Sequence, residues 1–329
     1  MGTWVVPADL LARSRFTVSP LSETVAALTV LSMPDPPGLP WERAFRAPHH
    51  EAYVRMLAED ELRSALADRL WRPRRGERPG WMAGFLALPP LGGDASFTDE
   101  LGQLDSWDDS QILQELREFT ACPLPRVLDR PGLRDAVAGI LRWVWTTTLL
   151  SDWPRRRRVL EADIVARTSR LASHGWTGVF ATLGSATRWV GDGHLQINRY
   201  ELPSRDLSAA RELSFVPVHA NGSWTAWDPP GRFALIYPVT GAMADLGDAA
   251  PGALARLIGA NRTRVLTLLG EPHSTTQLAA LTGLPAGAVG NHLKVLLDAG
   301  AVLRRRAGRE VLYWRTSLGD SLVAVESGA

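Results

Sequence analysis

The stretch from Ser274 to Gly300 reads STTQLAALTGLPAGAVGNHLKVLLDAG. Ser274, with Gln277 three residues later, is a capping box and predicts the start of a short helix. Gly283 supplies the left-handed conformation that ends this helix, and Pro285 begins the next helix two residues later. A short helix, a tight turn with glycine and a longer helix are the parts of a helix-turn-helix.

The longer helix, Pro285 to Asp298, is predicted to have one buried and one exposed face. Its apolar residues recur at spacings of three and four, at Val289, Leu293, Leu296 and Leu297. The opposite face presents Gly287, Ala288 and Asn291, with His292 and Lys294 on its flanks. Because the second helix of such a motif enters the major groove of DNA, we expect Asn291 to contact bases. For His292, contact with the DNA backbone and a buried structural hydrogen bond remain alternatives.

Two strands are predicted after this helix, Ala301 to Arg304 and Glu310 to Arg315, joined by a turn that contains Gly308. Arginines cluster at the tip of this hairpin. A guanidinium group matches the fork geometry of phosphate, and phosphate contacts position a protein on DNA. A solvated charged loop is the alternative, but the surrounding elements favour a DNA-binding wing. The residues expected to contact double-stranded DNA are Ser274, Thr275, Thr276, Gly287, Ala288, Asn291, His292, Lys294, Arg304, Arg305, Arg306 and Arg309.

Two helices are expected before the motif, Leu254 to Ile258 and Arg262 to Leu269, the second capped by Asn261. From residue 251 to 316 the chain holds nine basic and three acidic residues, whereas the net charge of the whole chain is only +1. Basic charge therefore gathers where a polyanion is expected to bind. The Gly/Ala/Asp-rich stretch Gly241 to Gly252 has the composition of a linker, which places a domain boundary near Ala249.

The region before the linker is predicted to be mostly helical with a small β portion, so the fold class is α+β. The expected domains are 1–249 and 250–329. Helices are predicted at Leu21 to Leu31, entered through Ser19 and Pro20, at His49 to Leu70, around Ile112 to Phe119, at Leu133 to Leu149, and at Arg155 to Ser173, the last ended by Gly175. Strands are predicted at Val179 to Leu183, His194 to Tyr200, Leu213 to Val218 and Phe233 to Val239, with a tight turn at Gly191 to Gly193.

Composition narrows the function classes. A single cysteine, Cys122, excludes an intrachain disulfide and an all-thiolate metal site within one chain. We expect a cytoplasmic protein with no membrane association, because neither a signal peptide nor an apolar run of about 18 residues occurs. The only lysine, Lys294, is not in a phosphate-binding loop. Without a nucleophile elbow, a zinc-protease motif or a dinucleotide motif, we expect no enzyme, no cofactor and no metal site.

The role of the first 249 residues stays open. They are not needed to hold a winged helix, so a ligand-sensing or protein-interaction module is the alternative main function, with the DNA-binding domain as its output. Twelve of the 13 tryptophans lie in this region and could line a small-molecule effector site, although ordinary core packing is favoured. The basic run Arg155 to Arg158 is interpreted as a solvated helix end with acidic neighbours, rather than as a second DNA contact.

The C-terminal segment LIGANRTRVLTLLGEPHSTTQLAALTGLPAGAVGNHLKVLLDAGAVLRRRAGREVLYWRTSLGD resembles the winged-helix domain of ArsR-type bacterial transcription regulators. The resemblance rests on HLKVLLDAG at 292–300 and the arginine-rich wing. The whole chain also resembles an actinobacterial group of such regulators with a long N-terminal domain, through RSRFTVSPLSETVAAL, LEADIVARTSRLASHGW and LIYPVTG. The resemblance implies homodimers on inverted-repeat operators, often acting as repressors.

Two departures from that family affect the expectations. The recognition face, where the family usually carries polar or basic side chains, here has Gly287, Ala288 and Gly290, so direct base readout is expected to be sparse. The segments that hold metal ligands in metal-sensing members lack thiolates and an acid/His cluster here. The sequence therefore predicts no metal sensing at those places.

Overall fold

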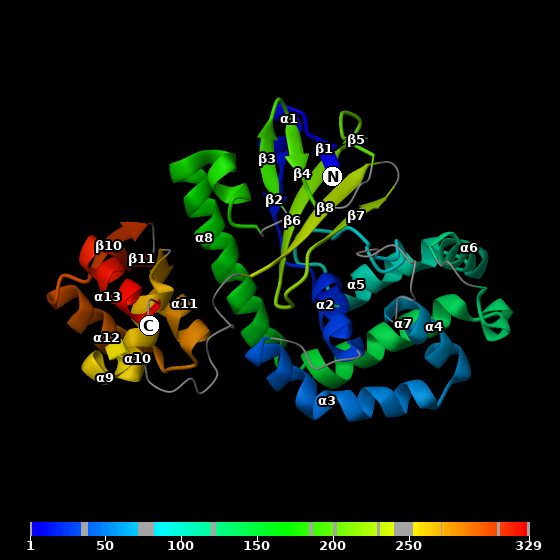
Figure 1. Cartoon of the computed structure of the whole chain (residues 1–329), viewed down its shortest axis with the longest axis horizontal. Coiled ribbons are helices and arrows are strands. Elements are labelled where there is room, and N and C mark those ends of the chain that lie inside the picture. The colour runs from blue at the N-terminus through cyan, green and yellow to red at the C-terminus, as the bar shows by residue number, and fades with distance from the viewer. Residues whose placement is uncertain are drawn as a thin grey trace. The chain divides into compact units, whose positions relative to one another are not determined.

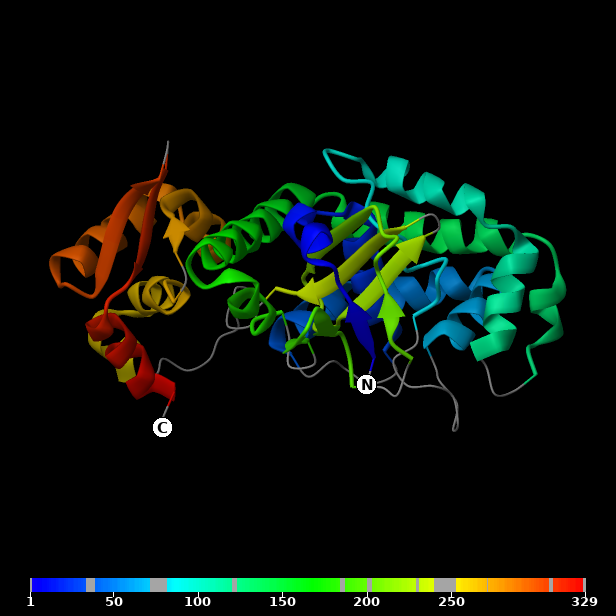
Figure 2. The same cartoon turned by 90° about the horizontal axis from the view of Figure 1, so that it is seen from above.

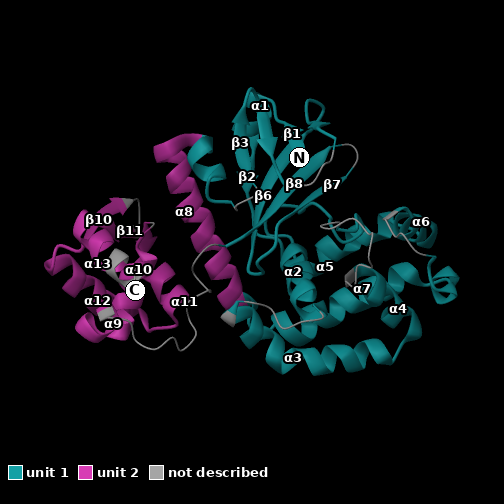
Figure 3. Ribbon diagram, viewed as in Figure 1, with its two compact units in different colours: residues 1–153, 176–239 teal, residues 154–175, 240–329 magenta. Residues whose placement is uncertain are grey.

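The computed structural model describes residues 2–33, 39–71, 82–119, 123–183, 187–199, 203–228, 231–239, 253–270, 272–307 and 310–327. The chain forms two compact units (Figure 3). Unit 1 comprises Met1–Trp153 and Trp176–Val239, and unit 2 comprises Pro154–Gly175 and Thr240–Ala329. Both units combine helices with β-sheet, so the fold is α+β, as the sequence predicts.

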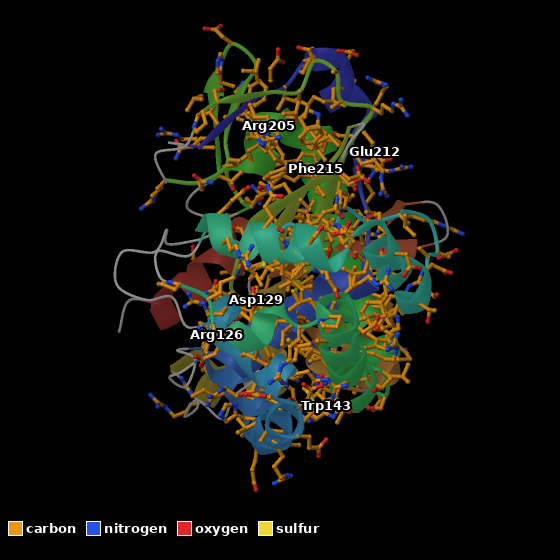
Figure 4. All side chains as sticks on the ribbon, turned by 90° about the vertical axis from the view of Figure 1, so that its right-hand side faces the viewer. Arg126, Asp129, Trp143, Arg205, Glu212 and Phe215 are labelled. Carbon is orange, nitrogen blue, oxygen red and sulfur yellow. The ribbon has the colours of Figure 1, made fainter. Side chains whose placement is uncertain are left out.

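Unit 1 has a helical portion and a sheet portion (Figure 1). Its helices before residue 153 are α1 (Ala8–Arg13), α2 (Pro20–Ser32), α3 (Pro40–Ala58), α4 (Glu61–Trp71), α5 (Phe97–Leu101), α6 (Asp109–Phe119) and α7 (Leu133–Val144), the last continued by a π-helical stretch, Trp145–Leu149. In Figure 4, Arg126, Asp129 and Trp143 mark the helical portion, whereas Arg205, Glu212 and Phe215 mark the sheet portion.

Helix α2 lies at the centre of unit 1. Ser19 caps it by accepting a hydrogen bond from the backbone N–H of Ser22, at 2.9 Å, as the sequence predicts. On one side Val25 and Leu28 join the core of the surrounding helices, and on the other side Ala26 and Val30 pack against the sheet. Because α2 is covered on several sides, its buried residues do not form a single apolar stripe, and even its polar residues Glu23 and Thr24 are buried.

The sheet under α2 has the strand order β2-β6-β8-β7, formed by β2 (Arg15–Phe16), β6 (Glu212–Val218), β8 (Arg232–Pro238) and β7 (Trp224–Asp228). Strand β6 is parallel to β2 and β8, and β7 is antiparallel to β8. Nearly all of β6 is buried, as expected for a strand covered on both faces. A second sheet has the order β3-β4-β1-β5, formed by β3 (Arg188–Gly191), β4 (His194–Gln196), β1 (Thr3–Val5) and β5 (Arg205–Asp206).

Several sequence predictions for unit 1 need correction. The helix expected at His49 to Leu70 is two helices, α3 and α4, and α3 begins earlier and contains Pro48. Residues Val179 and Phe180 end helix α8 (Trp153–Phe180), so the strand predicted at Val179 to Leu183 is wrong. Both residues are fully buried, and a short apolar run by itself does not distinguish a buried helix end from a buried strand. The predicted turn at Gly191 to Gly193 is confirmed, between β3 and β4.

Unit 2 contains part of α8 together with the C-terminal elements (Figure 3). These are α9 (Ala253–Ile258), α10 (Ala260–Leu268), β9 (His273–Ser274), α11 (Thr275–Thr282), α12 (Ala286–Asp298), β10 (Val302–Ala307), β11 (Glu310–Arg315) and α13 (Ser317–Ser327). Gly259, not Asn261, is the N-cap of α10, so Asn261 lies inside the helix and that prediction is wrong. The predicted linker, Gly241 to Gly252, and Cys122 lie outside the described residues.

Candidate nucleic-acid interface

Helix α11 begins with the capping box that the sequence predicts. The hydroxyl of Ser274 accepts from the backbone N–H of Gln277 at 3.4 Å, and the Gln277 side chain accepts from the N–H of Ser274 at 2.6 Å. Ser274 is buried, so its hydroxyl is committed to the cap. Thr275 is half-buried and Thr276 is exposed, so they are the polar side chains that the first turn presents outward. Gly283 ends α11 in the left-handed conformation, with φ of 70°.

Helix α12 has the two faces that its sequence predicts. Val289, Leu293 and Leu296 are buried in the core of unit 2. The other face is open, because Gly287, Asn291 and Lys294 are exposed and Ala288 and His292 are half-buried. The helix begins at Ala286, with Pro285 as its N-cap.

The wing is an antiparallel hairpin of β10 and β11, drawn in orange to red in Figure 2. Arg304, Arg305 and Arg306 are exposed, and Arg309 lies outside the described residues. Since side chains alternate along a strand, Arg304 and Arg306 share the face of buried Val302, whereas Arg305 lies on the opposite face. The sequence placed these arginines in one cluster. The structure instead distributes them over the two faces of the wing.

A third strand, β9, was not predicted. It pairs with β11, with Leu312 opposite Ser274 and Tyr313 opposite His273, and so joins the base of the wing to the start of α11. His273 is buried, and burial lowers its pKa to about 4 because the charged imidazolium loses its hydration, while Asp163 of α8 opposes the shift. His273 is therefore neutral at physiological pH. Two residues beside a capping box carry no strand periodicity, so the sequence offered no signal for β9.

Two glycines of unit 2 differ in what surrounds them. A Cβ added at Gly290, in α12, would meet no atom within 4 Å. A Cβ added at Gly319, in the first turn of α13, would lie 2.3 Å from the carbonyl oxygen of Ala301 and 3.1 Å from Cβ of Arg315. Packing thus requires glycine at position 319, whereas the space around position 290 can accept a Cβ atom.

We expect Gly290→Ala to raise the free energy of unfolding of unit 2 by about 0.5–1 kcal/mol, because alanine loses less conformational freedom than glycine in a helix. Gly319→Ala is the matched comparison, and we expect it to lower that free energy by about 1–3 kcal/mol, because α13 must move away from Ala301. Scanning calorimetry of the full chain measures both changes. A lower transition temperature for Gly290→Ala would show that its surroundings are not open.

Among the residues that the structure describes, no helix is long and apolar enough to cross a membrane. The same residues contain no group of three or more His, Cys, Asp or Glu side chains placed to hold a metal ion. The candidate site thus consists of the exposed face of α12, the first turn of α11 and the wing.

Comparison with known proteins identifies the same region. Residues 260–305 match a protein-family model described as a helix-turn-helix domain, and this match runs from the start of α10 to Arg305 in β10. No curated protein matches the chain. The C-terminal part of the chain therefore carries a helix-turn-helix, the DNA-binding module of many regulators.

Proposed function

We propose that the protein is a sequence-specific regulator of transcription of the ArsR type, which binds double-stranded DNA through unit 2. The observation that supports this most directly is the exposed face of α12 together with three exposed wing arginines, within the region that matches the helix-turn-helix family. In this proposal α12 enters the major groove, Thr275 and Thr276 lie against the backbone, and the wing contacts adjacent phosphates.

Few side chains on α12 can read bases. Gly287, Ala288 and Gly290 offer no polar group, which leaves Asn291 and His292 as the main polar side chains, with exposed Lys294 on the flank. Each bidentate contact to a base contributes about 1–3 kcal/mol of discrimination, so much of the specificity must come from DNA shape and from the spacing of two half-sites. Gly290 and Gly287 also permit a close approach of the helix backbone to the groove.

We further propose that the protein binds as a homodimer to inverted repeats and acts as a repressor. Leu257 of α9 is 75% exposed and Leu318 of α13 is 49% exposed. Helices α9 and α13 contact each other, so both leucines can belong to one apolar seam for a second copy. Leu322, from the same face of α13, is half-buried against the core of unit 2.

A salt titration of the full-length wild type on a duplex selected from a random pool tests this function. With about four phosphate contacts per subunit and two subunits, we expect log K against log salt to have a slope near −7, from about 0.9 per contact. Fluorescence anisotropy measures the affinity at each salt concentration. The absence of any binding in dilute buffer would overturn the proposal.

A further inference from the structure

The two faces of the wing differ in chemistry. The pairing of β10 with β11 places Arg304 and Arg306 on the face of Val302, which is buried in the same core as α12. The same register puts the remaining residues of the middle of the hairpin on its outer face, which comprises Leu303, Arg305, Ala307, Glu310, Leu312 and Trp314. The outer face thus holds only one of the three arginines of β10.

Apolar side chains surround Arg305 on the outer face. Leu303 lies two residues away on the same strand and is 49% exposed, and Leu312 lies directly opposite Arg305 on β11. Trp314 lies opposite Leu303, and both Leu312 and Trp314 are half-buried. The described part of the outer face is therefore a single exposed guanidinium group beside aliphatic and aromatic side chains.

This composition fits the minor groove of DNA better than it fits phosphate groups. Phosphates are charged and hydrated, so leucine and tryptophan gain nothing beside them. The walls of the minor groove are sugar rings with apolar C–H groups, and its floor carries the acceptors N3 of adenine and O2 of thymine. Proteins that bind there combine arginine with apolar side chains such as leucine, and the outer face offers both.

The wing is long enough to reach that groove from α12. Strand β10 has six residues, which extend about 20 Å at about 3.3 Å per residue. Major and minor grooves alternate along one side of B-DNA about 17 Å apart, which is half of the helical repeat of about 34 Å. With α12 in the major groove, Arg304 and Arg306 can contact the intervening phosphate backbone while the outer face lies along the adjacent minor groove.

We propose that the outer face of the wing reads the minor groove next to α12, and that Arg305 selects A·T over G·C pairs there. An A·T pair presents only acceptors in this groove, whereas a G·C pair adds the N2 amino donor of guanine, which opposes a guanidinium donor. Narrow A·T-rich minor grooves also carry an enhanced negative potential. The proposal rests on the proposed function, and it supplies sequence discrimination that the glycine-containing face of α12 lacks.

The first experiment uses the full-length wild type and duplexes selected from a random pool. We expect the selected sequences to hold A·T pairs about five base pairs, half a helical turn, from the centre of each half-site. These pairs are then replaced by G·C or by hypoxanthine·C, which lacks the N2 amino group but keeps the major-groove edge of guanine. We expect G·C to lower the affinity about tenfold and hypoxanthine·C to change it less than about twofold, measured by fluorescence anisotropy.

Variants then assign the discrimination to one face of the wing. We expect Arg305→Ala to bind the G·C and hypoxanthine·C duplexes equally. Arg304→Ala is the matched control on the other face, because it should lower the affinity for both duplexes and keep their ratio. Leu303→Ala should lower the affinity about threefold without changing the slope of log K against log salt, since an apolar contact releases no counterions.

Two results of the first experiment would overturn the proposal: random sequence at the selected flanking positions, or equal affinity of the wild type for the G·C and hypoxanthine·C duplexes. Discrimination that persists in Arg305→Ala would also overturn it, because another surface would then read the groove. A wild type that binds no duplex would instead overturn the proposed function.

Discussion

The double variant Arg304→Ala, Arg306→Ala loses about a hundredfold in affinity for duplex DNA near physiological salt. Both side chains are exposed and share one face of the wing, so both can meet the same phosphate backbone. A dimer would lose four phosphate contacts, which reduces the slope of log K against log salt by about 3 to 4. The loss should be similar for all DNA sequences, because phosphate contacts carry no sequence information. Anisotropy titrations at several salt concentrations measure both quantities.

The matched control removes the same charge from unit 1. Arg126 and Arg142 are exposed, and we expect Arg126→Ala, Arg142→Ala to leave the salt slope within about 0.5 of wild type. Arg305→Ala separates the two faces of the wing, because Arg305 lies opposite Arg304 and Arg306. An unchanged slope for the Arg304/Arg306 variant would exclude this face of the wing from the DNA contact and leave Arg305, α12 and the first turn of α11 as the remaining candidates.

Local signals predicted the secondary structure around the candidate site well. The capping box at Ser274, the left-handed Gly283 and the apolar spacing of α12 each depend on residues within about one or two turns, and each is found in the structure. The fold class followed from the same kind of pattern. The two wing strands were also predicted, although β10 extends further, to Ala307.

Features set by distant partners were not predictable in this way. Strands β2, β5 and β9 have two residues each and exist only because another strand lies beside them. The division of the wing arginines between two faces depends on the register with β11. The inclusion of Pro154–Gly175 in unit 2 depends on its clustering with a segment far along the sequence, for which periodicity carries no information.

Replacing Glu23 by alanine lowers the free energy of unfolding of unit 1 by about 3–5 kcal/mol. Glu23 lies on the central helix α2 and is 1% exposed. One carboxylate oxygen accepts from the backbone N–H of His219 at 3.0 Å, and the other lies 3.0 Å from Nδ1 of the same histidine, just beyond the end of β6. Alanine leaves these buried groups of His219 without their acceptor and opens a cavity between helix and sheet.

Glu51→Ala is the matched control, because the side chain of Glu51 is 86% exposed and pairs only across one turn with Arg55. Exposed pairs of this kind contribute less than about 1 kcal/mol. Glu23→Gln keeps one acceptor oxygen and should therefore fall between the two in urea denaturation. If Glu23→Ala costs no more than Glu51→Ala, the contact between α2 and His219 does not hold the sheet against the helical core.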